Sequence, residues 1–138
     1  MNIALLSHDR KKELMVQFCM AYSGILAKHS ICATSTTGRV VGEATGLPIT
    51  QYLSCTHGGA QQIGARIAYN EIDLVLFFTD PQAGELDQEL DQIIRLCDQY
   101  SVPIATNVAT AELLILGLAR GDLDWREGLK PGITPFST

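Results

Sequence analysis

Four consecutive hydroxyl residues and a glycine, Thr34-Ser35-Thr36-Thr37-Gly38, follow an apolar run that ends at Ala33. Hydroxyl and backbone N–H groups gathered where a strand gives way to a helix bind anions, because the positive end of the helix dipole favours a phosphate. The simpler interpretation is a turn that only caps the helix. One hydroxyl would be enough for a cap, so four in a row favour a phosphate cradle.

Three other polar segments follow apolar runs in the same way. They are His8-Asp9, with Lys12 one turn later, then Ser54 to Gly59, and Thr79-Asp80-Pro81. If these segments meet, they bring together hydroxyls, a lysine, histidines and carboxylates from separate strands. Such a combination favours a binding or catalytic site more strongly than any single motif does. Whether these segments meet depends on the elements that carry them.

Apolar periodicity predicts strands that alternate with helices along most of the chain. The expected strands are 2–6, 30–33, 48–53, 72–78 and 102–105, and the expected helices are 10–28, 40–46, 60–69, 87–100 and 111–118. Asp9 is expected to cap the first helix. This alternation predicts an α/β fold, a doubly wound and mainly parallel sheet in three layers. In such sheets ligands bind at the carboxyl ends of the strands, which is where all four polar segments fall.

The bulk composition fits one globular domain. The chain has 138 residues, of which 46% are hydrophobic and 18% charged. We expect a domain over residues 1–120 and an extension over 121–138 that packs on it or trails from it. The net charge of −5 argues against nucleic acid or an anionic membrane as a partner. The start of the chain lacks signal-peptide features and its four cysteines are scattered, so we expect a cytoplasmic protein without a metal site.

Taken together, the polar segments resemble the methylglyoxal synthase family, from Met1 to about residue 126. The matching motifs are His8-Asp9 with Lys12, Ala33-Thr34-x-Thr36-Thr37-Gly38, Ala44-Thr45-Gly46, Gly58-Gly59-x-Gln61-Gln62-x-Gly64, Phe77-Phe78-x-Asp80-Pro81 and Pro103-x-Ala105-Thr106-Asn107-Val108-Ala109-Thr110-Ala111. The family is similar in fold to the regulatory domain of carbamoyl phosphate synthetase, which binds effectors.

The resemblance implies a reaction and a set of site residues. The family eliminates phosphate from dihydroxyacetone phosphate through an enediolate, as a hexamer and without a metal or other cofactor. By resemblance, a small phosphorylated metabolite or inorganic phosphate would be bound by the following groups: His8, Lys12, Thr34, Ser35, Thr36, Thr37, Ser54, Cys55 and Arg95. Asp9 and Asp80 also match positions at the family's site.

The sequence departs from the family where the chemistry takes place. The family's catalytic aspartate falls on Ala60, whose methyl group cannot accept a proton. The segment from Gln82 to Asp87 lacks the family's substrate-binding histidine and is one residue shorter. Cys55 and Ser35 replace two glycines of the family pattern.

Three interpretations remain open from the sequence. In the first, the protein performs the family's elimination weakly or with a relocated base, for which Asp9, Asp80 and His57 are candidates. In the second, it acts on another phosphorylated small molecule and uses Cys55 and His57. In the third, it is a non-catalytic regulatory protein that binds a phosphorylated metabolite. By resemblance, each would be a homo-oligomer.

Overall fold

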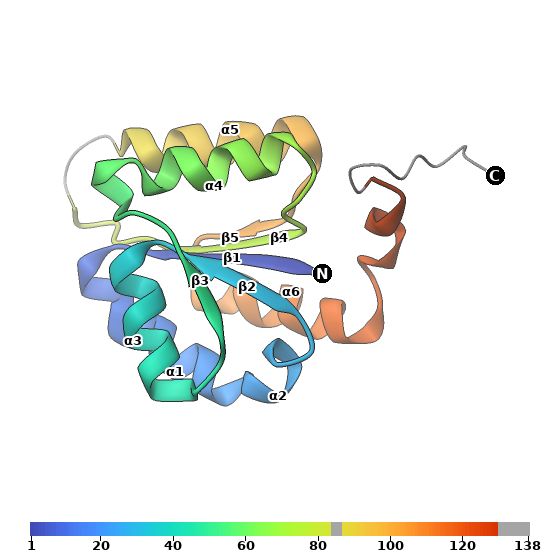
Figure 1. Ribbon diagram of the computed structural model, residues 1–138, viewed down its shortest axis with the longest axis horizontal. Coiled ribbons are helices and arrows are strands. Elements are labelled where there is room, and N and C mark those ends of the chain that lie inside the picture. Colours follow the sequence, from blue (N-terminus) through green and yellow to red (C-terminus); the bar gives the residue numbers. More distant parts are fainter. Residues whose placement is uncertain (84–86, 130–138) are drawn as a thin grey trace.

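The computed structural model describes residues 1–83 and 87–129, drawn in colour in Figure 1. Two parts of the expectations lie outside these residues: most of the shortened segment between Gln82 and Asp87, and the end of the extension beyond residue 129.

Five parallel strands form one sheet in the order β3-β2-β1-β4-β5. The strands are β1 (Asn2–Ser7), β2 (Ser30–Ala33), β3 (Ile49–Gln51), β4 (Leu74–Phe78) and β5 (Ile104–Ala105). Every residue of β4 is buried, as expected for a central parallel strand that is covered on both faces. The sheet confirms the doubly wound α/β fold.

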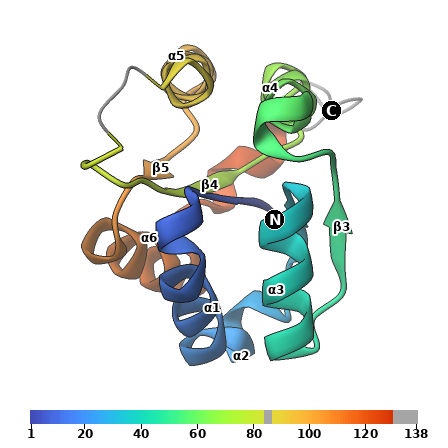
Figure 2. The same cartoon turned by 90° about the vertical axis from the view of Figure 1, so that its left-hand side faces the viewer.

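Helices cover both faces of the sheet, so that the molecule has three layers (Figure 2). One face carries α1 (Lys12–Ala21), α2 (Ser23–Leu26), α3 (Ser35–Thr45) and α6 (Val108–Arg120), and the other carries α4 (Gly59–Ala68) and α5 (Gln88–Tyr100). Three short 3₁₀ turns, η1 (Asp9–Lys11), η2 (Cys55–His57) and η3 (Asp124–Leu129), complete the described elements.

The alternation of side chains along the strands divides the core into two clusters. Ile3 and Leu5 of β1 pack with the α1, α3 and α6 side, whereas Ala4 and Leu6 pack with the α4 and α5 side. Successive residues of a strand point to opposite faces, so one short apolar strand supplies both clusters. The sheet is thereby held rigidly between the helices, and its carboxyl edge is fixed in place.

Two expectations about the helices are corrected. The helix expected over 10–28 is divided into η1, α1 and α2, and Asp9 caps none of them, because its carboxylate binds the Lys12 ammonium instead. The helix expected from Val40 begins at Ser35. The hydroxyl block is therefore the first turn of α3 rather than a loop before it.

The described part of the extension is anchored by a buried ion pair. Arg126 is fully buried, and its Nε donates to Asp73 Oδ1 at 3.2 Å. The same guanidinium donates to the carbonyls of Ser101 and Ile72.

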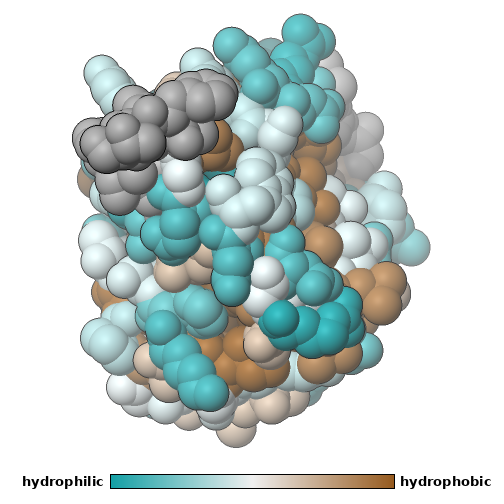
Figure 3. Space-filling view, turned by 90° about the vertical axis from the view of Figure 1, so that its right-hand side faces the viewer, coloured by the Kyte–Doolittle hydropathy of each residue, from teal (hydrophilic) through white to brown (hydrophobic). Residues whose placement is uncertain are grey.

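Figure 3 shows the molecule from the side on which the strands begin, where hydrophilic side chains are interspersed with hydrophobic ones. Among the described helices, none is long and apolar enough to cross a membrane.

Arg126→Ala should strongly destabilise the protein, because it removes the buried guanidinium that binds Asp73 and the carbonyls of Ser101 and Ile72. Breaking one side of a buried pair costs about 3–5 kcal/mol. Urea unfolding would measure the loss. Arg120→Ala is the matched control, since its pair with Asp122 is more than half exposed and such pairs contribute about 0–1 kcal/mol. Equal losses in the two variants would contradict an anchoring role for Arg126.

Candidate functional site

A pocket of about 350 Å³ lies where β1, β2 and the loop after β3 end, beside the start of α5. It is lined by Ser7, His8, Asp9, Lys12, Thr34, Thr36, Ser54, Cys55, Thr56, Ala83, Asp87 and Glu89. The carboxyl ends of the parallel strands bring these segments together, as the sheet topology requires.

Lys12, the first residue of α1, supplies a cation to the pocket. Its Nζ donates to Asp9 Oδ1 at 2.8 Å and to the Ser7 carbonyl at 3.2 Å. The hydrogen bond and the charge of Lys12 lower the pKa of the Asp9 carboxyl. The Lys12 side chain is only 19% exposed, whereas that of Asp9 is 99% exposed. The lysine is thus held in place, and its carboxylate partner is free to turn into solvent.

The hydroxyl block contributes one wall of the pocket. Thr34 is the N-cap residue of α3, but its side chain makes no capping hydrogen bond, so capping does not explain the hydroxyl. Thr34 and Thr36 line the pocket, and Thr37 lies behind them, buried against Ser7 with 2.9 Å between the two hydroxyl oxygens. The N–H groups of a first helical turn have no partner within the helix, so this wall offers donors as well as hydroxyls.

The loop before α4 forms a second wall and depends on two glycines. Gly58 has a φ of 104°, in the left-handed region that favours glycine. A Cβ on Gly59 would lie 2.0 Å from the Leu53 carbonyl oxygen, so only glycine fits there. Within this loop the Ser54 hydroxyl and His57 Nδ1 are 2.6 Å apart. Burial and the nearby carboxylates of Glu89 and Asp87 raise the pKa of the Cys55 thiol to about 11.

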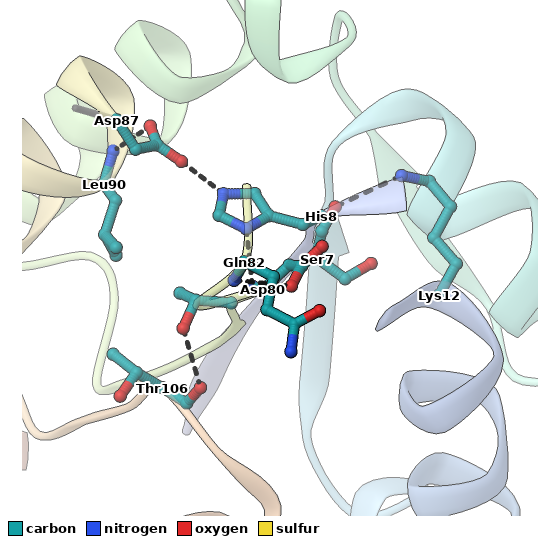
Figure 4. Close-up of polar contacts among 9 residues, drawn as sticks. Ser7, His8, Lys12, Asp80, Gln82, Asp87, Leu90 and Thr106 are labelled. Carbon is teal, nitrogen blue, oxygen red and sulfur yellow. Dashed lines mark hydrogen bonds and ion pairs between the residues drawn. The ribbon is translucent and has the colours of Figure 1, made fainter. Parts of the chain in front are cut away.

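His8 joins the end of β1 to the start of α5 (Figure 4). The backbone N–H of Asp80 donates to His8 Nδ1 at 2.7 Å, which means that Nδ1 is the unprotonated nitrogen. His8 Nε2 therefore carries the ring proton and donates it to Asp87 Oδ2. Figure 4 shows Asp87 and Leu90 on one side of the His8 ring and Lys12 on the other.

Asp87 caps α5 and binds His8 at the same time. Its Oδ1 accepts from the Leu90 N–H at 2.9 Å, while Oδ2 accepts from His8. Burial would raise the pKa of this carboxyl, but the hydrogen bonds from Leu90, His8 and Glu89 and the charge of His8 outweigh burial and lower it. Asp87 is therefore held as a carboxylate.

Seven of the expected site residues line the pocket: His8, Asp9, Lys12, Thr34, Thr36, Ser54 and Cys55. Five others lie outside that lining, and Thr37 is the one buried behind it. Of the remaining four, Asp80 borders an adjoining hollow with His8 and Asp9, Ser35 lies at the start of α3, His57 is exposed on its loop, and the 80% exposed Arg95 side chain binds Asp91. Ala60 is fully buried and lies outside the lining.

Sequence reasoning missed five lining residues: Ser7, Thr56, Ala83, Asp87 and Glu89. Asp87 could have been found, because an Asp before an apolar periodic run is a helix N-cap signal and places α5 at the carboxyl edge. Glu89 looks like an ordinary acidic residue of a first helical turn.

No cluster of three or more His, Cys, Asp or Glu suited to a metal occurs among the described residues.

The fold and the pocket define the class, a three-layer α/β protein with a polar pocket at the carboxyl edge of its sheet. Residues 14–106 match the model of the MGS-like domain family. The methylglyoxal synthase of Caldicellulosiruptor saccharolyticus is 55% identical over 132 residues, which cover 95% of this chain and 94% of the relative. That of Lysinibacillus sphaericus is 54% identical over 127 residues, covering 91% and 95%.

A solved structure agrees with these matches. The crystal structure of methylglyoxal synthase from Elizabethkingia anophelis superposes with a TM-score of 0.77 at 38% identity, covering 83% of this chain and 76% of that one. The chain therefore belongs to the MGS-like domain family, and its resemblance to methylglyoxal synthases is confirmed.

Inorganic phosphate should raise the melting temperature of the wild type through Lys12 and the α3 wall. Ligand at ten times its dissociation constant stabilises the native state by about 1.4 kcal/mol, which corresponds to a few degrees. Lys12→Ala should remove most of this shift in a thermal melt. Lys28→Ala, which changes a lysine outside the pocket lining, should retain it. No stabilisation of the wild type at millimolar phosphate would refute the binding assignment.

Asp87→Asn should cost stability at neutral pH and progressively less in acid. The native pKa of Asp87 lies below its usual value of 3.8, so its ionised form stabilises the native state above that value. The contribution is lost as the pH falls through the lowered native pKa. Asparagine still caps a helix, so the variant tests charge rather than capping. Urea unfolding of both proteins at pH 7 and pH 3 measures the difference, and a gap of equal size at both values would contradict the prediction.

Proposed function

We propose that this protein is a lyase that binds a small phosphorylated keto compound, of the dihydroxyacetone phosphate class, and eliminates phosphate from it. We propose that its activity is weak or altered, because position 60 carries a methyl group. The observation that carries the proposal is the Lys12 ammonium, held at the carboxyl edge of the sheet opposite the first turn of α3. Its cytoplasmic location and hexameric assembly are proposed from the family resemblance alone.

The binding step follows from charge and geometry. A phosphomonoester dianion would take the Lys12 ammonium from Asp9, whose exposed carboxylate can move into solvent. Hydroxyls of Thr34, Thr36 and Ser54, together with N–H groups at the start of α3, would surround the phosphate oxygens. The pocket volume of about 350 Å³ is sufficient for a three-carbon phosphate.

The chemical step needs a base for a carbon-bound proton and a donor for the oxyanion that develops on the neighbouring carbonyl oxygen. His8 has its Nε2–H directed at Asp87 and its Nδ1 occupied by the Asp80 N–H, so both ring nitrogens are engaged. A ring held in this way can orient substrate in the pocket. It is not placed as a free base, and Ala60 offers none.

Two alternative functions carry less support. An enzyme that uses Cys55 and His57 would need a reactive thiolate, yet burial and nearby carboxylates raise the pKa of Cys55 to about 11. The His57 ring bonds to Ser54 within its own loop. A non-catalytic regulatory protein would share the phosphate site, and the absence of any turnover would favour it.

The wild type should convert dihydroxyacetone phosphate to methylglyoxal more slowly than the relative from Caldicellulosiruptor saccharolyticus, by at most the factor of about 10²–10⁴ that a positioned base contributes. Assays of methylglyoxal and phosphate release under the same conditions would measure both rates. Ala60→Asp should recover part of the rate. Ala65→Asp, which places a carboxylate on an exposed part of α4, should recover none.

Equal rates for the wild type and the relative would contradict a weakened lyase. Phosphate binding without any release, in the wild type and in Ala60→Asp alike, would replace the lyase proposal with a binding role.

A further inference from the structure

The carboxylates that line the pocket lie in two groups. Asp9 belongs to the phosphate end, where it binds Lys12. Asp87 and Glu89 come from the start of α5, which Figure 4 shows on the opposite side of His8 from Lys12. A ligand with its phosphate at Lys12 would therefore extend its carbon skeleton toward the start of α5. A base for the proposed elimination would therefore lie at the start of α5.

Asp87 is not free to act as a base, since both of its oxygens are engaged. Oδ1 is bound by the Leu90 N–H, and Oδ2 is bound by His8. The resulting low pKa makes it a poor proton acceptor. The role that fits Asp87 is positional, because it holds the His8 ring and the first turn of α5 in a fixed relation.

Glu89 differs from Asp87 in its place on the helix. It lines the pocket half-buried, two residues into the helix, where it does not serve as the cap. Its carboxylate lies close enough to the facing loop to raise the pKa of the Cys55 thiol. Glu89 therefore places a carboxylate on the α5 side of the pocket.

The remaining candidates are placed less well. Asp9 is bound to Lys12, 99% exposed, and lies at the phosphate end. Asp80 lies outside the pocket lining, with Oδ1 accepting from the Gln82 N–H and Oδ2 3.9 Å from Arg10. His57 is exposed on its loop and outside the lining. Among the pocket carboxylates, only Glu89 is neither a helix cap nor the partner of a cation in the described part of the chain.

We propose that Glu89 is the general base of this protein and replaces the carboxylate that the family pattern places at position 60. Its carboxylate removes a proton from the hydroxymethyl carbon. The C–H electron pair forms a C=C bond, and the carbonyl π pair moves to oxygen. This gives an enediolate. The inference rests on the proposed elimination.

In the second half of the reaction, the enediolate eliminates phosphate. As the enediol hydroxyl of the former hydroxymethyl carbon loses its proton, a C=O bond forms there. The C=C pair shifts to the adjacent carbon, and the C–O bond to phosphate breaks with its electron pair leaving on phosphate. The enolate that results takes back, at carbon, the proton held by Glu89 and becomes methylglyoxal, and the hydroxyl proton leaves on phosphate. No oxidant, reductant or metal is needed.

Glu89→Gln should lower the turnover of dihydroxyacetone phosphate by about 10²–10⁴-fold relative to the wild type. In D₂O, ¹H NMR should show the same variant losing exchange of the hydroxymethyl hydrogens of the substrate, which reports the proton-removal step directly. The stabilisation by inorganic phosphate in a thermal melt should stay unchanged, because the Lys12 ammonium is held by Asp9 and the Ser7 carbonyl and not by Glu89. Glu89→Asp should retain part of both activities.

Asp91→Asn is the matched control. Asp91 lies in the same first turn of α5 and pairs with the exposed Arg95, so its loss should leave turnover and exchange unchanged. Wild-type rates in Glu89→Gln would overturn the assignment of Glu89 and leave the lyase intact. A wild type that binds phosphate but neither exchanges nor eliminates would overturn the lyase and, with it, the base.

Discussion

The constraint on which this structure depends is the burial of a parallel sheet on both faces. β1 and β4 lie at its centre, and every residue of β4 is buried between the two helical layers. Parallel strands all end at the same edge, so polar residues that follow them must meet there. The segments at His8, Thr34 and Ser54 are far apart in the sequence but line one pocket for this reason.

The pocket contains a lysine although the molecule as a whole is negatively charged. The chain carries a net charge of −5, and three carboxylates line the pocket beside a single lysine. The carboxylates are spatially separated, since Asp9 is exposed and can leave Lys12, whereas Asp87 is held by His8 and the α5 backbone. An anion would therefore meet one cation and the α3 N-terminus at one end of the pocket, and fixed negative charge at the other.

The sequence was sufficient to predict the strands, the sheet class and seven of the residues that line the pocket, because apolar periodicity and polar strand ends are local signals. It failed where a side chain has two possible partners. Asp9 looked like a helix cap but binds Lys12, and the capping signal at Asp87 was overlooked. Arg126 gave no local signal, because its burial depends on Asp73, which is distant in sequence. Glu89 and Asp91 are both acidic residues of the first turn of α5, yet Glu89 lines the pocket and Asp91 binds Arg95, which the local sequence does not distinguish.

In the proposed lyase, the methyl group at position 60 would separate binding from chemistry. Ala60 belongs to α4, whose loop packs so closely that Gly59 admits no Cβ, whereas Lys12 and Thr34 belong to α1 and to the cap of α3. A change on α4 can therefore remove a base without disturbing the phosphate end. The start of α5 faces the same pocket from the other side and is fixed there through Asp87 and His8. A carboxylate on that turn, such as Glu89, can approach the ligand without any repacking of α4.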